Sequence, residues 1–149
     1  MANDLLSSMH ISAAGMTAQR TRMDIVSENI ANAESTRTEN GGGPYKRRQV
    51  VFQAVTPQQT FSHVFNSAFQ PDKHQSVKAA YIAEDNKPFR EVYDPSHPDA
   101  DSNGIVKMPN VNPVQEMVDM NGAARSFEAN VTTMEASKRM FLKSLELLR

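Results

Sequence analysis

The stretch that decides the fold lies at the C-terminal end, PVQEMVDMNGAARSFEANVTTMEASKRMFLKSLELLR, residues 113–149. Apolar side chains recur there at alternating spacings of three and four residues, the spacing of one face of a helix. The positions on this stripe are Met117, Met120, Ala124, Phe127, Val131, Met134, Lys138, Phe141, Leu145 and Leu148. Only Lys138 is polar, and its stem can cover apolar surface while its charge points outward. The pattern predicts a long helix with a coiled-coil-like seam.

The start of this helix is marked by capping residues. Asn112 is an N-cap candidate, Pro113 suits the first helical position, and Gln115 can act in a variant of the capping box. We therefore expect one helical segment over residues 112–149.

Residues 1–33 predict a second helix, because they contain no Pro and one Gly. Six apolar side chains fall on one stripe, four of them seven residues apart: Leu5, Met9, Met16, Met23, Val26 and Ile30. This seam is weak, because the polar Ser12 and Gln19 interrupt it. Asn3 or Asp4 can cap the start, and Asn29 and Asn32 bracket the expected end.

The composition changes at residues 35–44, STRTENGGGP, whose glycines suit a flexible joint. Beyond it, strands are expected at residues 45–55, 77–83, 88–94 and 105–108, with a turn at 84–88. Phe61, Phe65 and Phe69 are four residues apart within 57–76, which suits either a short helix or an anchored loop. The chain is thus predicted to be mainly α, with two long terminal helices flanking a small β insert over 34–111.

Composition excludes several classes of protein. The 149 residues suit one domain or a compact body with attached arms, and the absence of Cys excludes disulfides and thiolate metal sites. A net charge of −1 gives no global attraction to nucleic acid. No stretch approaches the roughly 18 apolar residues of a membrane span, so direct membrane insertion is not expected. The first residues lack the basic region of a cleaved signal peptide, which predicts a different route for any export.

The densest group of metal-ligand types is residues 94–104, DPSHPDADSNG. Asp99, Asp101, Asn103 and Gly104 match the opening of a calcium-binding EF-hand loop. The twelfth position, which needs a bidentate carboxylate, is Asn110, so a plain turn is the favoured interpretation. A metal-dependent module that also uses His97 is the alternative, and calcium, manganese or zinc uptake would reveal it.

No catalytic constellation is recognisable, and neither an enzyme activity nor a cofactor is predicted. The histidines, His10, His63, His74 and His97, lack metal-ligand spacing. The basic run Lys46–Arg48 favours a solvated strand edge. A nucleic-acid adaptor that uses this run with Tyr45 and Phe52 is the weaker alternative.

The helices carry little apolar surface for their length, and the outer face of the first is Ser, Thr, Gln and Asn rather than Glu and Lys. Such residues pack against neighbours at lower cost than charged ones. We therefore expect further helix faces to be buried against other chains. The alternative is a monomeric helical hairpin capped by a small sheet.

A family resemblance points the same way. Residues 12–36, SAAGMTAQRTRMDIVSENIANAEST, resemble the signature of the bacterial flagellar axial proteins, the rod and hook subunits, with its Asn motif at Asn29, Ile30, Ala31 and Asn32. GGPYKRRQVVFQ at 42–53 and the stretches 94–120 and 124–140 extend the resemblance to both ends of the chain. Family members of the distal rod and hook pass directly from the Asn motif into Pro-Gly-Tyr. Here RTENGGG precedes Pro44 and Tyr45, which favours a proximal-rod subunit over another axial subunit.

The resemblance implies a non-catalytic subunit of the flagellar basal body, located in the periplasmic rod and exported without a cleaved signal by the flagellar type III apparatus. The terminal helices are expected to pair, to order on assembly and to pack into the tube wall. Implied partners are copies of itself, homologous rod subunits, ring or adaptor components and the export apparatus, with no nucleic acid. The Asn-motif amides are expected to meet backbone groups at the helix end.

Overall fold

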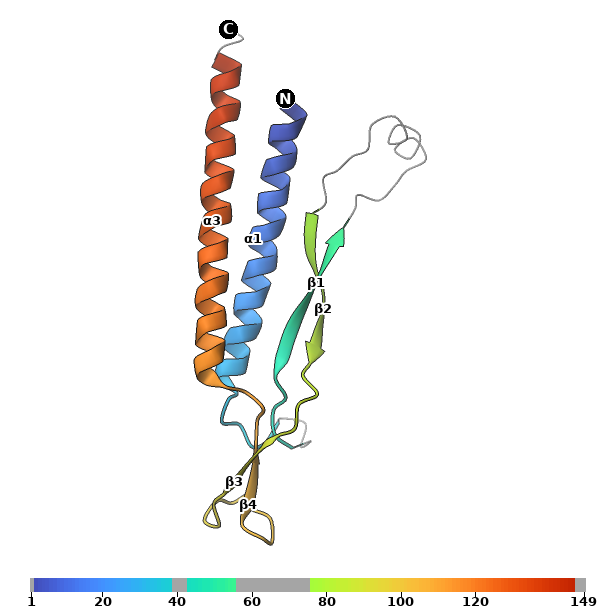
Figure 1. Ribbon diagram of the computed structural model, residues 1–149, viewed down its shortest axis with the longest axis vertical. Coiled ribbons are helices and arrows are strands. Elements are labelled where there is room, and N and C mark those ends of the chain that lie inside the picture. Colours follow the sequence, from blue (N-terminus) through green and yellow to red (C-terminus); the bar gives the residue numbers. More distant parts are fainter. Residues whose placement is uncertain (1, 39–42, 56–75, 147–149) are drawn as a thin grey trace, which may run out of the picture. The chain divides into compact units, whose positions relative to one another are not determined.

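The computed structural model describes residues 2–38, 43–55 and 76–146, with side chains from residue 6 onward. Two long helices come first and last in the chain, with a small β region between them in the sequence (elements labelled in Figure 1), which confirms the expected fold class. In chain order the elements are α1 (Ala2–Ala31), β1 (Arg48–Val55), β2 (Ser76–Glu84), β3 (Arg90–Tyr93), β4 (Ile105–Met108) and α3 (Pro113–Glu146). Four predicted features lie outside the described residues: residues 57–75 of the aromatic segment 57–76, Gly41, Gly42 and Leu148. The side chain of Leu5 lies outside them as well.

The predicted cap of α3 is confirmed. The side-chain oxygen of Asn112 accepts hydrogen bonds from the N–H groups of Val114 at 3.1 Å and Gln115 at 3.5 Å. Its carbonyl accepts from the N–H of Glu116 at 3.0 Å, the first hydrogen bond of the helix. Pro113 occupies the first helical position, where a missing N–H costs nothing.

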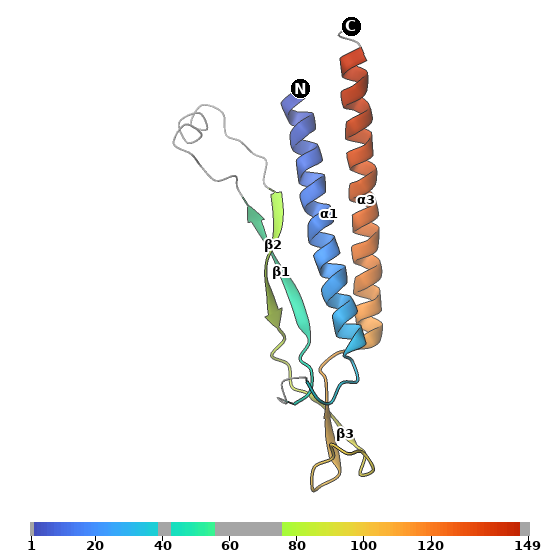
Figure 2. The same ribbon diagram turned by 180° about the vertical axis from the view of Figure 1, so that it is seen from behind.

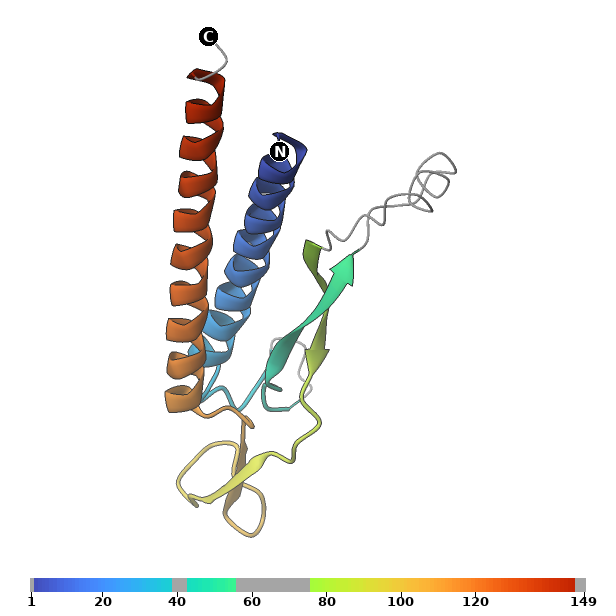
Figure 3. The same ribbon diagram turned by 45° about the horizontal axis from the view of Figure 1, so that its top comes forward.

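The β region is a pair of two-stranded sheets, β1 with β2 and β3 with β4, as the alternating stretches predicted. Figure 3 shows both hairpins. β3 and β4 are antiparallel, and Glu91 lies opposite Lys107 in their register, an opposite-charge cross-strand pair. Gly104, next to the start of β4, has a φ of +74°, a left-handed conformation that favours glycine.

By internal contacts the chain divides into two compact units. Unit 1 comprises residues 1–20, 52–80 and 124–149, and unit 2 comprises 21–51 and 81–123. Most of the buried side chains among the described residues belong to unit 2: Ile25, Val26, Asn29, Ala33, Tyr45, Val106, Pro109, Val111, Glu116 and Ala123. Among the described side chains of unit 1, the buried ones are the small Ser12, Ala18 and Ser137. Most of the core that the described residues form is therefore in unit 2.

Within unit 1, α1 and α3 are in contact through small and polar side chains. The Ser8 hydroxyl donates to the Ser137 hydroxyl at 3.2 Å. A Cβ placed on Gly15 would lie 2.9 Å from the side-chain nitrogen of Asn130, so the helices approach closely there. The two contacts are seven residues apart on each helix and run in opposite directions, as in an antiparallel pair (Figure 2).

The face of α3 that meets α1 lies one residue away from the apolar stripe predicted from spacing. Ser137 and Asn130 contact α1, whereas the stripe positions next to them are Lys138 and Val131. Lys138 and Leu145 are exposed, and Val131 is half-buried. The stripe positions Phe127, Met134 and Phe141 are half-buried, and helical geometry places them between the two faces.

Gly104 and Gly122 form a matched pair for testing backbone conformation in unit 2. Gly104→Ala should lower the free energy of unfolding by about 1–2 kcal/mol, because its φ is positive and the new Cβ would lie 3.0 Å from the Tyr93 ring. Gly122→Ala should raise it by about 0.5–1 kcal/mol, because α3 offers open space there.

Urea unfolding monitored by tyrosine fluorescence measures both variants, since the chain has no Trp and its three tyrosines all lie in unit 2. Equal stability of the two variants would contradict the assigned turn at Gly104.

Candidate functional site: a buried polar junction in unit 2

Asn29 forms the centre of a polar junction where the end of α1 meets the start of β1 and α3. It is only 1% exposed, and its amide makes four hydrogen bonds. The nitrogen donates to the carbonyl of Arg48 at 2.8 Å and to a carboxylate oxygen of Glu116 at 2.9 Å. The oxygen accepts from the Arg48 N–H at 2.9 Å and from the Tyr45 hydroxyl at 3.0 Å. Asn29 thus pairs with both backbone groups of Arg48, as a neighbouring strand would.

Glu116, in the first turn of α3, is completely buried. One carboxylate oxygen lies 2.7 Å from each of two guanidinium nitrogens of Arg47, and the other oxygen accepts from Asn29. Burying a carboxylate costs several kcal/mol unless it is ion-paired and hydrogen-bonded, and here it is both. Glu116 therefore joins α3 to α1 and to the residue before β1.

Arg47 connects the junction to the segment between β2 and β3. The guanidinium of Arg47 lies 3.7 Å from the carboxylates of Asp85 and Asp119. The backbone N–H of Arg47 donates to the side-chain oxygen of Asn110 at 2.8 Å. The amide of Asn110 donates to the carbonyls of Asp85 and Lys87, both at 3.1 Å. Five segments of unit 2 are thus held by side chains rather than by a continuous sheet.

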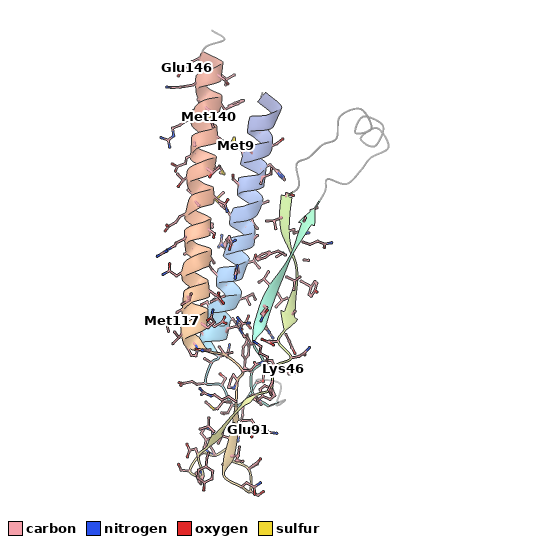
Figure 4. All side chains as sticks on the ribbon, viewed as in Figure 1. Met9, Lys46, Glu91, Met117, Met140 and Glu146 are labelled. Carbon is pink, nitrogen blue, oxygen red and sulfur yellow. The ribbon has the colours of Figure 1, made fainter. Side chains whose placement is uncertain are left out.

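The prediction of a solvated strand edge for the basic run is wrong for Arg47. Its side chain is only 18% exposed, and its guanidinium pairs with the completely buried Glu116 instead of facing water. Arg48 pairs with Glu28 at 2.6 Å and lies 5.6 Å from the centre of the Tyr45 ring. Lys46 remains exposed and pairs with Glu84 at 3.4 Å. In Figure 4 side chains crowd this region around Lys46.

Burial and nearby carboxylates perturb Tyr45. Desolvation, followed by the charge of Glu28, raises the pKa of its hydroxyl from 10.0 to about 12. A neutral hydroxyl is thereby kept as a donor to Asn29, since ionisation would remove that hydrogen bond.

Asn32, the second asparagine of the Asn motif, forms hydrogen bonds at the end of α1. The Asn32 amide donates to the carbonyl of Glu28 at 2.9 Å, and its oxygen lies 3.3 Å from the Ser35 hydroxyl, which donates to it. Both motif amides therefore meet backbone groups, Asn32 within α1 and Asn29 at β1. Of the residues between them, Ile30 is half-buried and Ala31 is exposed.

The loop at 94–104 is a turn that holds the chain beyond the Asn motif. Asp99 accepts hydrogen bonds from the Thr36 hydroxyl at 2.7 Å and from Arg37 at 2.5 Å, and these bonds lower its pKa. The Gly104 N–H donates to the Asp101 carbonyl at 2.8 Å, closing the turn. Among residues 2–38, 43–55 and 76–146 no group of three or more potential ligands is placed to hold a metal ion.

The structure locates the remaining predicted stripe residues. Met9, Met16 and Met23 on α1 are half-buried and Val26 is buried. On α3, Met120 and Ala124 are half-buried, whereas Met117 is exposed. Sequence reasoning missed Glu116, Arg47 and Asn110 as junction residues. Glu116 lies seven residues before Ala123, on the face of α3 that carries small residues and not on the apolar stripe. This spacing was the available sign that Glu116 faces the interior.

Comparison with known proteins gives matches to two family models. Residues 9–37 match the family described as flagella basal body rod protein, and residues 102–147 match flagellar basal body rod FlgEFG protein C-terminal. The flagellar basal-body rod protein FlgC of Bacillus subtilis (strain 168) is 44% identical over 145 residues, covering 94% of this chain and 95% of the relative. The chain belongs to the FlgC family of flagellar basal-body rod proteins. It is a structural subunit of the basal-body rod.

Two further relatives with the FlgC name show how widely the similarity extends. That of Borreliella burgdorferi is 41% identical over 97% of this chain and 98% of the relative. That of Salmonella typhimurium is 39% identical over 96% and 97%. Neither helix of the FlgC-family chain, within its described residues, has a stretch long and apolar enough to cross a membrane.

Asn29→Asp should destabilise unit 2 by about 2–4 kcal/mol, because two donors are lost and a second carboxylate faces Glu116. Asn29→Asp combined with Glu116→Gln should recover part of this loss, since a glutamine amide can donate to the new carboxylate. A urea-unfolding double-mutant cycle measures the coupling. Additive effects would show that the two side chains do not interact.

The raised pKa of Tyr45 predicts a loss of stability in alkali. The Tyr45 hydroxyl ionises near pH 10 in the unfolded chain and near pH 12 in the folded chain. Its contribution to the free energy of unfolding is therefore complete below pH 10 and is lost as pH rises toward 12. The loss should reach about 2 kcal/mol. Tyr45→Phe should lack this component, and comparing the two proteins by urea unfolding at stepwise pH isolates it. Parallel pH profiles would refute the raised pKa.

Proposed function

We propose that this chain is a proximal-rod subunit that polymerises through α1 and α3, encloses the flagellar export channel and transmits torque across the periplasm. The junction at Asn29, Glu116 and Arg47 is the observation that carries the proposal. It fastens the end of α1 and the start of α3 to one folded unit. A subunit that transmits torque needs its helices to be firmly attached to a folded unit, because force applied to either helix must reach the rest of the chain.

Burial supports assembly through the outer halves of the helices. The core lies in unit 2, whereas the described helix segments of unit 1 leave Leu6, Met140, Leu142 and Leu145 about half exposed. Apolar side chains of this size favour burial by roughly 1.5–3 kcal/mol each. Contacts with other subunits are the natural source of that burial, and the segments become rigid on assembly.

The proposed partners follow from this role. They are copies of the same chain, homologous rod subunits, ring or adaptor components at the ends of the rod, and the export apparatus that delivers the chain without cleaving a signal. The chain acts as a structural part and not as an enzyme. Each polar group of the junction serves another group of the same chain, with Glu116 shared by Arg47 and Asn29.

Val131→Asp tests the proposal in cells that lack the native chain. A charge at this half-buried position of α3 should abolish swimming, because it disfavours burial of the helix by several kcal/mol. Ala136→Asp is the matched control, since Ala136 is exposed on the same helix. Cells that carry this control variant should swim normally. Soft-agar motility and the protein content of purified basal bodies are the measurements. Normal swimming by the Val131 variant, or a chain absent from basal bodies of motile cells, would contradict the proposal.

A further inference from the structure

The hairpin of β1 and β2 is a long sheet of only two strands. The strands run in opposite directions (Figure 3), and no third strand joins them among the described residues. They span eight and nine residues. A two-stranded hairpin is marginally stable in water by itself, so further contacts are expected to cover it.

Hydrogen bonds at one end of the hairpin show which backbone groups point outward. The N–H of Asp85, the residue after β2, donates to the carbonyl of Arg47 at 2.8 Å. Arg48, the next residue on β1, points both of its backbone groups to Asn29 and away from β2. Backbone direction alternates in this way along antiparallel strands. The residues of β2 whose backbone groups point outward are therefore Lys78, Ala80, Ile82 and Glu84.

The outer edge of β2 lacks the usual protection of an edge strand. No side chain of the described residues bonds to the backbone of residues 78–84 as Asn29 bonds to Arg48. β2 contains no Pro, and its only charged residues are Lys78 and the terminal Glu84. Tyr81 is 63% and Ile82 50% exposed, and neighbouring residues point to opposite faces, so both faces are open there. An edge of this kind readily pairs with another strand.

The side chains of β2 fit a second copy of the same strand. Antiparallel pairing centred on Tyr81 sets the two Tyr81 rings opposite each other, as an aromatic cross-strand pair. On that face each ring is flanked by the small Ala79 and Ala83, which leave room for it. On the other face Ile82 of each copy lies opposite the small Ala80 of the other copy. Large side chains therefore meet small ones on both faces of the strand.

Charge agrees with the same register but is the smaller argument. Lys78 of one copy lies opposite Glu84 of the other. Glu84 already contacts Lys46 at 3.4 Å, and both of these side chains are about half exposed, so neither pair is strong. β3 is the alternative strand, but it offers four residues and would set Arg90 and Glu91 against the apolar centre of β2.

We infer that the free chain forms a two-fold dimer in which the β2 strands of two copies pair antiparallel, centred on Tyr81, into a four-stranded sheet. Each copy contributes the same surface, so the contact closes on two copies and does not extend into a tube. The dimer is therefore distinct from any contact that repeats along the rod. It protects the open edge of β2 from wrong pairing in chains that have not yet assembled.

Single cysteines test the register in the purified full-length chain, which has no Cys of its own. Tyr81→Cys places the two thiols at a close cross-strand pair, within reach of a disulfide. Tyr93→Cys is the matched control, because Tyr93 is 74% exposed on β3. Under mild oxidation the disulfide dimer of Tyr81→Cys should form at least about tenfold faster than that of Tyr93→Cys, because strand pairing raises the effective concentration of the thiols. Non-reducing gels measure both rates.

Ala80→Pro tests the strand edge itself. The Ala80 N–H points outward, so proline removes a hydrogen bond between copies and none of the ladder with β1. Ala80→Ser keeps the N–H and the small side chain and is the matched control. Sedimentation velocity over a range of concentrations should show a monomer–dimer equilibrium for the native chain and for Ala80→Ser, and a monomer for Ala80→Pro. Urea unfolding of Ala80→Pro should match that of the native chain.

Several results would overturn the inference. A native chain that stays monomeric, or that associates only into larger species, would show that a second copy does not close the β2 edge. Equal crosslinking rates at Tyr81 and Tyr93, or a dimer that survives Ala80→Pro, would place the contact elsewhere. If Ala80→Pro fails to fold, the two crosslinking rates alone decide.

Discussion

The structure depends on one buried contact, the hydrogen bond from the Asn29 amide to the Glu116 carboxylate. Both side chains are at most 1% exposed, so each would be costly to bury alone. Arg47 binds one carboxylate oxygen of Glu116, and the Asn29 amide nitrogen donates a hydrogen bond to the other oxygen. Through this pair the end of α1, the start of α3 and the start of β1 become one unit.

The choice of asparagine follows from that geometry. Only a side chain with two donors and an acceptor can bond the carbonyl and the N–H of Arg48 while also bonding a carboxylate. Aspartate lacks the donors, and an aliphatic residue would leave Glu116 and the backbone of Arg48 unsatisfied. Asn29, which belongs to the motif that marks the family in the sequence, is thus the residue that the junction requires.

The sequence predicted the elements better than it predicted the site. Periodicity and capping identified both long helices and the Asn112 cap, because these signals depend on neighbours in the chain. The ion pair of Arg47 with Glu116 joins residues 69 positions apart, and no local pattern distinguishes it from surface charge. The heptad spacing of α3 predicted an apolar stripe along the helix but did not show which surface packs against that stripe. Small residues such as Ser137, which look unremarkable in a sequence, determine the face that meets α1.

The most direct measurement is hydrogen exchange at the backbone N–H of Arg48, followed by NMR in the free chain and in Asn29→Ala. This N–H donates to a side chain and not to another strand, so its protection reports the junction alone. We predict slow exchange in the native chain and a rise to rates near those of an open amide in the variant, with the β3–β4 amides less affected. Fast exchange in the native chain, or equal protection in both proteins, would contradict a fold organised by Asn29.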